Sequence, residues 1–181
     1  MANDKQQYVY LFPQRNEGGV TWTWLYNGQS GPASNFPVIE AKKNSGGHDI
    51  YFTVFDPQNT IKFAGYNGPD TTKAIAIAEK QPTAPKPNTG IDTKGEVKEI
   101  TFKQDGAQLF LDNTNKKIMT LSYTLNFVDS STGQAVTSID PELKNGGGGT
   151  RFFDSYLVGA ILISALVTVA FVRFALGWRK V

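Results

Sequence analysis

Hydrophobic and polar side chains alternate along much of the first 145 residues, a pattern that predicts β-strands rather than helices. Successive side chains of a strand point to opposite faces of its sheet, so a half-buried strand carries apolar residues at every second position. We expect the segment from 119 to 127 to be half buried and near the centre of a sheet. There Met119, Leu121, Tyr123, Leu125 and Phe127 alternate with Thr120, Ser122, Thr124 and Asn126.

Further strands are expected wherever a short apolar run stops at turn residues. These runs cover residues 8–12, 20–26, 38–41, 50–55, 61–66, 97–102 and 107–111. The first should end before Pro13, because proline has no amide hydrogen to donate to a neighbouring strand. Residues 72–80 fit either a helix or a strand, and residues 81–90 are expected to form a loop. Seven or eight short strands without a convincing long helix predict an all-β head, folded as an antiparallel β-sandwich.

The pattern changes near the C-terminus, where residues 156–172 contain no charged side chain and the apolar segment extends to Trp178. A helix over 156–178 would be roughly 34 Å long, enough to cross a hydrocarbon core of about 30 Å. We therefore expect one transmembrane α-helix. The predicted segments are a β-sandwich head at 1–145, a Gly-rich hinge at 146–153, the transmembrane helix at 154–178 and a short basic tail at 179–181.

Residues that suit a membrane interface flank the apolar segment, where aromatic and cationic side chains meet lipid headgroups. They are Arg151, Phe152, Phe153, Arg173, Trp178, Arg179 and Lys180. Inside the segment Ala160, Ser164 and Thr168 recur every four residues and line one stripe of the helix. Small side chains at this spacing allow a second helix to approach closely. The expected partners are therefore membrane lipid and other integral membrane proteins.

The orientation in the membrane is expected to leave the head in the cytoplasm. The N-terminus lacks a basic start followed by a long apolar run, so no secretory signal is predicted. This predicts a tail-anchored, single-pass protein. Three cations follow the apolar core and two precede it, a weak bias toward the opposite orientation.

Charge and cysteine content narrow the function classes. Residues 1–150 hold 14 basic and 15 acidic side chains, whereas the last 31 residues carry a net charge of +3. The basic surplus belongs to the expected anchor, and the head has no basic stripe for phosphates, so nucleic-acid binding is not predicted. The absence of cysteine excludes disulfides, thiolate metal sites and cysteine nucleophiles.

A series of short motifs runs through residues 109–147. Leu-Phe-Leu-Asp-Asn at 109–113 is followed by Leu-Ser-Tyr-Thr-Leu at 121–125, Thr-Gly-Gln at 132–134 and Ile-Asp-Pro-Glu-Leu-Lys-Asn at 139–145. This resembles the small bacterial immunoglobulin-like domains that finish in Asp-Pro-x-Ile/Leu-x-Asn, among them the DP-EP family. The resemblance implies an immunoglobulin-like β-sandwich and brings no catalytic residues. In physical terms, the Asp-Pro pairs at 56–57 and 140–141 are expected to end strands, and the Asp side chain can cap the turn.

Two polar clusters are candidates for chemistry. His48 is the one histidine of the sequence, and no nucleophile motif or second histidine accompanies it, so we expect a surface loop residue. Oxygen-bearing side chains at 112–115 are similar to a calcium loop but lack its glycine and distal glutamate, which favours a plain turn. No catalytic residue, metal or cofactor is predicted.

Trp22, Trp24 and Tyr26 share one face of the expected strand at 20–26. Aromatic residues in this arrangement usually belong to the core of a sandwich. The alternative is an exposed interface for a partner chain or a glycan, since tryptophan and tyrosine are enriched at interfaces.

These features lead to two functional hypotheses. The first is a non-catalytic, single-pass membrane protein that serves as an accessory or scaffolding subunit of a larger membrane complex. The second is a membrane-tethered recognition module whose head binds a soluble protein or glycan, with Trp22 and Trp24 among the contacts.

Overall fold

The computed structural model describes residues 5–80, 91–92 and 95–147, which all belong to one compact unit spanning residues 3–149. The predicted transmembrane helix, its interface residues, its small-residue stripe and the basic tail lie outside the described residues, as does most of the hinge. Within the described ranges, no helix is long and apolar enough to cross a membrane.

The described part of the chain folds into thirteen strands in two mixed sheets, with two short 3-10 turns at Ala33–Asn35 and Thr71–Lys73. The first sheet has the order β3 (Gln29–Pro32), β2 (Gly19–Tyr26), β1 (Lys5–Asn16), β5 (His48–Val54), β10 (Gln108–Asn113) and β9 (Val97–Lys103). The second has the order β4 (Ile39–Ala41), β13 (Glu142–Gly146), β11 (Ile118–Asp129), β7 (Ile75–Glu79) and β8 (Ile91–Asp92). Two more strands, β12 (Ala135–Ile139) and β6 (Ile61–Phe63), also pair with β11.

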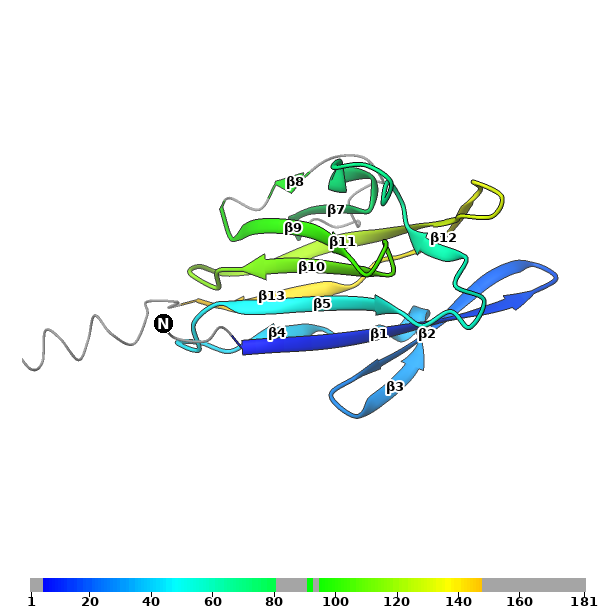
Figure 1. Cartoon of the computed structure of the whole chain (residues 1–181). Coiled ribbons are helices and arrows are strands. Elements are labelled where there is room, and N and C mark those ends of the chain that lie inside the picture. Colours follow the sequence, from blue (N-terminus) through cyan, green and yellow to red (C-terminus); the bar gives the residue numbers. More distant parts are fainter. Residues whose placement is uncertain (1–4, 81–90, 93–94, 148–181) are drawn as a thin grey trace, which may run out of the picture. The chain divides into compact units, whose positions relative to one another are not determined.

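The all-β prediction is confirmed, but a purely antiparallel arrangement is wrong. Three strand pairs are parallel: β1 with β5, β4 with β13, and β7 with β8. The first pair follows from the path of the chain. After β3 the chain contributes β4 to the second sheet and then returns as β5 beside β1 (Figure 1). Such a crossover connection allows parallel pairing, whereas a tight hairpin allows only antiparallel pairing.

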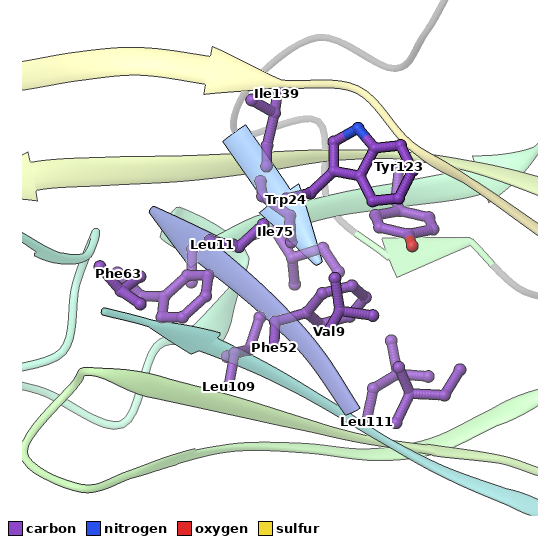
Figure 2. Packing of buried hydrophobic residues seen from close by; sticks show 14 of the residues in the cluster. Val9, Leu11, Trp24, Phe52, Phe63, Ile75, Leu109, Leu111, Tyr123 and Ile139 are labelled. Carbon is purple, nitrogen blue, oxygen red and sulfur yellow. The ribbon is translucent and has the colours of Figure 1, made fainter. Parts of the chain in front are cut away.

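The hydrophobic core lies between the two sheets, whose inner faces contribute buried side chains to one cluster (Figure 2). Aromatic contacts join the sheets directly: the ring centroids of Trp22 and Phe127 are 4.2 Å apart, and those of Phe52 and Tyr123 are 5.5 Å apart. Burial of this apolar surface is the main favourable term that holds the sheets together.

Strand β11 occupies the centre of the second sheet, as its alternation predicts. The expectation that it is only half buried is wrong. Every residue from 121 to 127 is buried, including the polar Ser122, Thr124 and Asn126. Asn126 finds partners there, because its side chain accepts a hydrogen bond from Ser138 and donates one to the Lys73 carbonyl oxygen.

Strand β1 runs through Pro13 to Asn16, so the prediction that it stops at Pro13 is wrong. The carbonyl of Leu11 accepts a hydrogen bond from the Phe55 amide and therefore points toward β5. The backbone nitrogen of Pro13, two residues further along β1, points in the same direction. The pairing between β1 and β5 ends at Leu11 and Val54, so no β5 residue lies opposite Pro13. Proline loses no ladder hydrogen bond at that position, which explains why the strand continues.

The segment at 72–80, left open between helix and strand, forms the 3-10 turn at 71–73 and then strand β7. Ile75 and Ile77 are fully buried on this strand. Burial against the core therefore outweighs the helix preference of the three neighbouring alanines.

Candidate functional site

The tryptophan cluster proposed as a possible interface lies in the core. Trp22, Trp24 and Tyr26 are 3%, 5% and 8% exposed. Trp22 Nε1 donates a hydrogen bond to the Thr137 carbonyl oxygen at 2.8 Å, and Trp24 Nε1 donates one to the Pro32 carbonyl oxygen at 2.9 Å. Both indole groups are satisfied inside the fold, so these side chains offer no surface to a partner.

The outer face of the first sheet carries a different group of aromatic side chains, which we call the aromatic face. It consists of Tyr8, Tyr10, Phe12, Tyr51, Phe55 and Phe110. Strand register brings them together, because Tyr51 on β5 pairs with Tyr8 on β1 and with Phe110 on β10. Figure 1 shows β1, β5 and β10 side by side.

The rings of the aromatic face form two contacting groups, which are joined through Tyr8 and Tyr10, whose ring centroids are 6.5 Å apart. Tyr8 stacks on Tyr51 at 5.0 Å with 15° between the ring planes, and the Tyr51 and Phe110 centroids are 5.2 Å apart. Phe55 extends the group, with its ring 5.5 Å from Tyr10 and 5.7 Å from Phe12. Tyr8 is 41% and Phe55 52% exposed. Contiguous exposed aromatic surface of this kind is typical of interaction sites.

A row of three carboxylates adjoins the aromatic face, and we call it the acidic row. Strand register places Asp49 of β5 beside Asp112 of β10, and Asp112 beside Glu99 of β9. Lys98, next to Glu99, has its Nζ 3.9 Å from Asp112 Oδ2. On the other side of the aromatic face, the Lys103 ammonium lies over the rings of Phe110 and Tyr51.

His48 is not a surface loop residue, so that prediction is wrong. It is the first residue of β5 and only 3% exposed. Its ring lies between the Gln7 amide, which contacts Nδ1, and Ser45 Oγ, which is 2.6 Å from Nε2. Local sequence did not reveal this burial, because it results from pairing with β1, where Lys5 opposes His48.

The hydrogen bonds around His48 assign its proton. Gln7 Oε1 accepts from the Tyr26 hydroxyl, so Gln7 Nε2 is the group that donates to His48 Nδ1. Ser45 Oγ donates to the Lys42 carbonyl oxygen at 2.6 Å, which leaves the Ser45 oxygen to accept from His48 Nε2–H. A histidine that donates to a serine does not act as its general base, so this pair is arranged as structure rather than as a nucleophile and its base.

The prediction of a plain turn at 112–115 is wrong, because Asp112 and Asn113 belong to β10 and the segment forms part of a buried polar network. Asn113 and Asn145 exchange hydrogen bonds through both amide groups, at 2.8 and 3.0 Å. Asn145 also donates to the Glu96 carboxylate, and the Asn115 side chain donates to the Lys42 and Gly46 carbonyl oxygens. Among the described residues, no group of three or more acidic or histidine side chains is placed to hold a metal ion.

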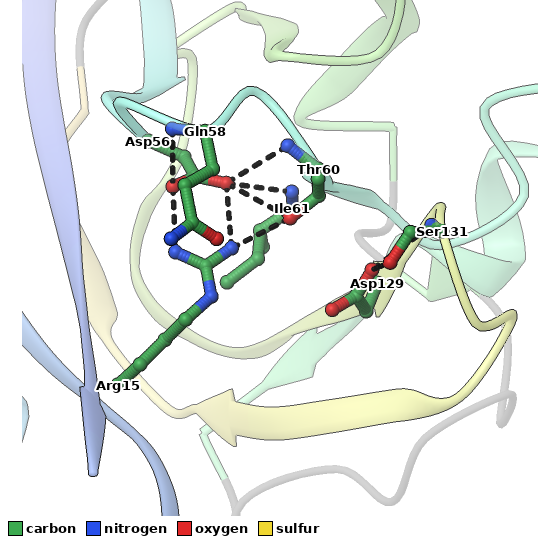
Figure 3. Close-up of polar contacts among 7 residues, drawn as sticks. All are labelled: Arg15, Asp56, Gln58, Thr60, Ile61, Asp129 and Ser131. Carbon is green, nitrogen blue, oxygen red and sulfur yellow. Dashed lines mark hydrogen bonds and ion pairs between the residues drawn. The ribbon is translucent and has the colours of Figure 1, made fainter.

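Asp56 confirms the expected capping role of its Asp-Pro pair. Its carboxylate accepts the backbone amides of Gln58, Thr60 and Ile61 and two hydrogen bonds from the Arg15 guanidinium, at 2.7 and 2.8 Å (Figure 3). The Arg15 hydrogen bonds, together with the backbone amides, hold the pKa of Asp56 well below its usual range. Asp140, which precedes Pro141, is exposed between β12 and β13.

The aromatic face was not predicted from the sequence. One signal was present at 8–12, where Tyr8, Tyr10 and Phe12 alternate with the buried Val9 and Leu11, so both faces of one strand are apolar. The remaining members come from strands far apart in the chain, and only the sheet order unites them. No protein-family model matches this chain, and no curated protein matches it, so its own geometry is the basis for a functional proposal.

Proposed function

We propose that the chain is a non-catalytic, single-pass, tail-anchored membrane protein that serves as an accessory or scaffolding subunit of a larger membrane complex. In this proposal the head is an immunoglobulin-like β-sandwich in the cytoplasm, and residues 154–178 form the anchor. Ala160, Ser164 and Thr168 pack against a partner helix. The head docks on the complex through its aromatic face.

The aromatic face is the observation that carries the proposal. A β-sandwich needs apolar side chains on its inner faces, but the outer face of a sheet is free to be polar. The outside of the first sheet carries six neighbouring aromatic side chains, each within ring contact of at least one other, which the core of this unit does not require. Tyrosine and phenylalanine are also enriched at the centres of protein interfaces.

A second candidate function is a membrane-tethered recognition module that binds a soluble protein through the same face. The geometry favours a protein over a glycan. Sugar rings stack on open aromatic faces, whereas Tyr8 and Tyr51 turn their ring faces toward each other, 5.0 Å apart. The Phe110 ring face is covered by Lys103, whose Nζ lies 4.2 Å from the ring centroid. Ring edges and the tyrosine hydroxyl groups remain for contact with a partner.

Purification of the tagged full-length chain from membranes in mild detergent, followed by mass spectrometry, tests the proposal. We expect stoichiometric integral membrane partners, and we expect Tyr8→Thr with Phe55→Thr to release them. The matched control is Ile118→Thr with Val38→Thr, because Ile118 is 78% and Val38 42% exposed and neither belongs to the aromatic face. Recovery of a lone monomer would overturn the subunit proposal. Partners retained equally by both double variants would overturn the role of the aromatic face.

A further inference from the structure

The acidic row and the aromatic face are neighbours on the same side of the first sheet. Asp49 lies two residues before Tyr51 on β5, and Asp112 lies two residues after Phe110 on β10. Side chains two residues apart on a strand point to the same face and are roughly 6.5 to 7 Å apart along it. A partner segment that follows the strand direction therefore meets aromatic rings and carboxylates in turn.

The acidic row gives this side of the face a negative charge. Register places Asp112 between Asp49 and Glu99, and like charges beside one another on adjacent strands destabilise a sheet. Lys98 offsets part of this charge, but its side chain is 55% exposed, so water screens its pair with Asp112. A cationic partner would be attracted by the carboxylates of the acidic row.

Lys103 demonstrates that the rings themselves accept a cation. Its Nζ lies 4.2 Å from the Phe110 ring centroid and 5.0 Å from that of Tyr51. A positive charge over an aromatic face is attracted by the negative π-electron density of the ring. Because Lys103 already covers these ring faces, a Lys or Arg side chain of a partner finds its favourable contact at the acidic row, and the ring edges are left for apolar side chains.

We infer that the occupant of the aromatic face is a cationic polypeptide segment, whose Lys or Arg side chains lie on the acidic row while its apolar side chains pack on the rings. This inference rests on the proposed function, because it names the chemistry of the partner that the aromatic face takes. A second copy of the chain fits less well. It would bring its own three carboxylates to the interface, and its Lys103 already lies over its own rings.

Peptide binding to the full-length chain in mild detergent tests the inference by fluorescence anisotropy. The first labelled probe is a synthetic peptide of Lys-Thr-Leu-Thr repeats, which in extended form presents lysine and leucine alternately on one side. The second is the Glu-Thr-Leu-Thr counterpart of the same length. We expect the lysine peptide to bind, with affinity that falls as salt is added, and the glutamate peptide not to bind.

Charge variants locate the binding on the acidic row. We expect Asp49→Asn, Glu99→Gln and Asp112→Asn together to weaken binding of the lysine peptide about tenfold. The control variant removes three exposed carboxylates elsewhere, by Glu17→Gln, Glu40→Gln and Asp140→Asn, and should bind like the unmodified chain. Thermal unfolding checks that both variants are folded, and the salt titration of the unmodified chain stays informative if one of them is not.

The outcomes separate this inference from the proposed function. Three results would overturn the inference of a cationic partner. They are equal binding of both peptides, an affinity that does not change with salt concentration, and unchanged binding in the acidic-row variant. If the acidic-row variant also keeps a membrane partner that the Tyr8/Phe55 variant loses, the aromatic face remains the docking surface and the charge inference alone fails. Self-association that disappears in the Tyr8/Phe55 variant would make a second copy the occupant and overturn the inference.

Discussion

At the scale of single residues, the Asp56 carboxylate holds together the connection between β5 and β6. Its side chain is 2% exposed, and the partners of its two oxygens come from Arg15 on β1 and from the backbone of residues 58–61. Because the fold lowers the pKa of this carboxyl, the charged form stabilises the folded state above the ordinary carboxyl pKa. That stabilisation is lost as the pH falls toward the lowered value.

Asp56→Asn should therefore reduce the free energy of unfolding by about 2 kcal/mol at pH 7, through loss of charge-assisted and capping hydrogen bonds. The difference between variant and unmodified chain should shrink as the pH is lowered from about 5 toward 2, because the unfolded chain then takes up a proton at Asp56 while the folded carboxylate stays charged. Urea unfolding at several pH values measures both effects. Asp140→Asn is the control, since Asp140 is exposed and its replacement should matter little. A pH-independent difference would contradict the argument.

Tyr123 shows the opposite situation, a polar group buried without a partner. The residue is 1% exposed, and its hydroxyl oxygen makes no hydrogen bond. Burial, with a smaller contribution from Tyr26, raises the pKa of this hydroxyl well above that of a free tyrosine. The neutral side chain is therefore compatible with the fold, and charging it above pH 10 is opposed by the core.

Tyr123→Phe should leave the fold equally stable or stabilise it by up to about 1 kcal/mol at pH 7, because a buried unsatisfied group is removed. A raised pKa contributes stability below the unfolded-state value near 10, and this contribution is lost at higher pH. The variant should therefore lose less stability than the unmodified chain between pH 9 and about 11. Tyr51→Phe, on the aromatic face, is the comparison. A clear loss of stability in Tyr123→Phe at pH 7 would show that its hydroxyl has a partner.

At the scale of elements, the alternation of apolar and polar residues located the strands along the chain, but it did not show which strands lie beside one another in a sheet. The pattern at 119–127 places β11 correctly, and Trp22 and Trp24 do share one face. The aromatic face depends on β1, β5 and β10 lying side by side, which follows from a crossover between sheets that no local pattern specifies. The prediction for His48 was wrong for the same reason, since its burial comes from pairing with β1, which also supplies Gln7, and its sequence context does not reveal that pairing.

The turn between β9 and β10 depends on close packing against a neighbouring loop. Gly106 has a φ of +75°, and a Cβ there would lie 2.3 Å from the Tyr66 side chain. Gly133 has a similar φ of +73°, but no atom lies within 4 Å of the position of its Cβ. Alanine variants at the two positions therefore distinguish the cost of a positive φ, which both share, from the cost of steric overlap, which arises at Gly106 alone.

Gly133→Ala should cost about 1 kcal/mol, the price of a positive φ in a residue with a Cβ. Gly106→Ala should cost at least 2 kcal/mol more, because Tyr66 and the turn must also move apart. Chemical denaturation of the two variants measures the difference. Equal losses would show that Tyr66 moves aside freely and that the packing of this turn is loose.

At the scale of the whole molecule, the membrane attachment and the folded head are expected to be separable. The described core cluster runs from Val9 to Leu143 within the compact unit at 3–149, and we expect this unit to fold without the apolar segment at 156–172. A chain ending at residue 149 should therefore unfold in one cooperative thermal transition and remain in the supernatant after membranes are sedimented. The full-length chain should sediment with membranes and resist extraction by alkaline carbonate, because about 17 uncharged residues are removed from water in the bilayer.

If the shortened chain also sedimented while folded, the head itself would bind membranes, and a docking role for the aromatic face would have to include lipid. If the full-length chain stayed in the supernatant, the tail-anchor proposal would be wrong, whatever partner the aromatic face takes.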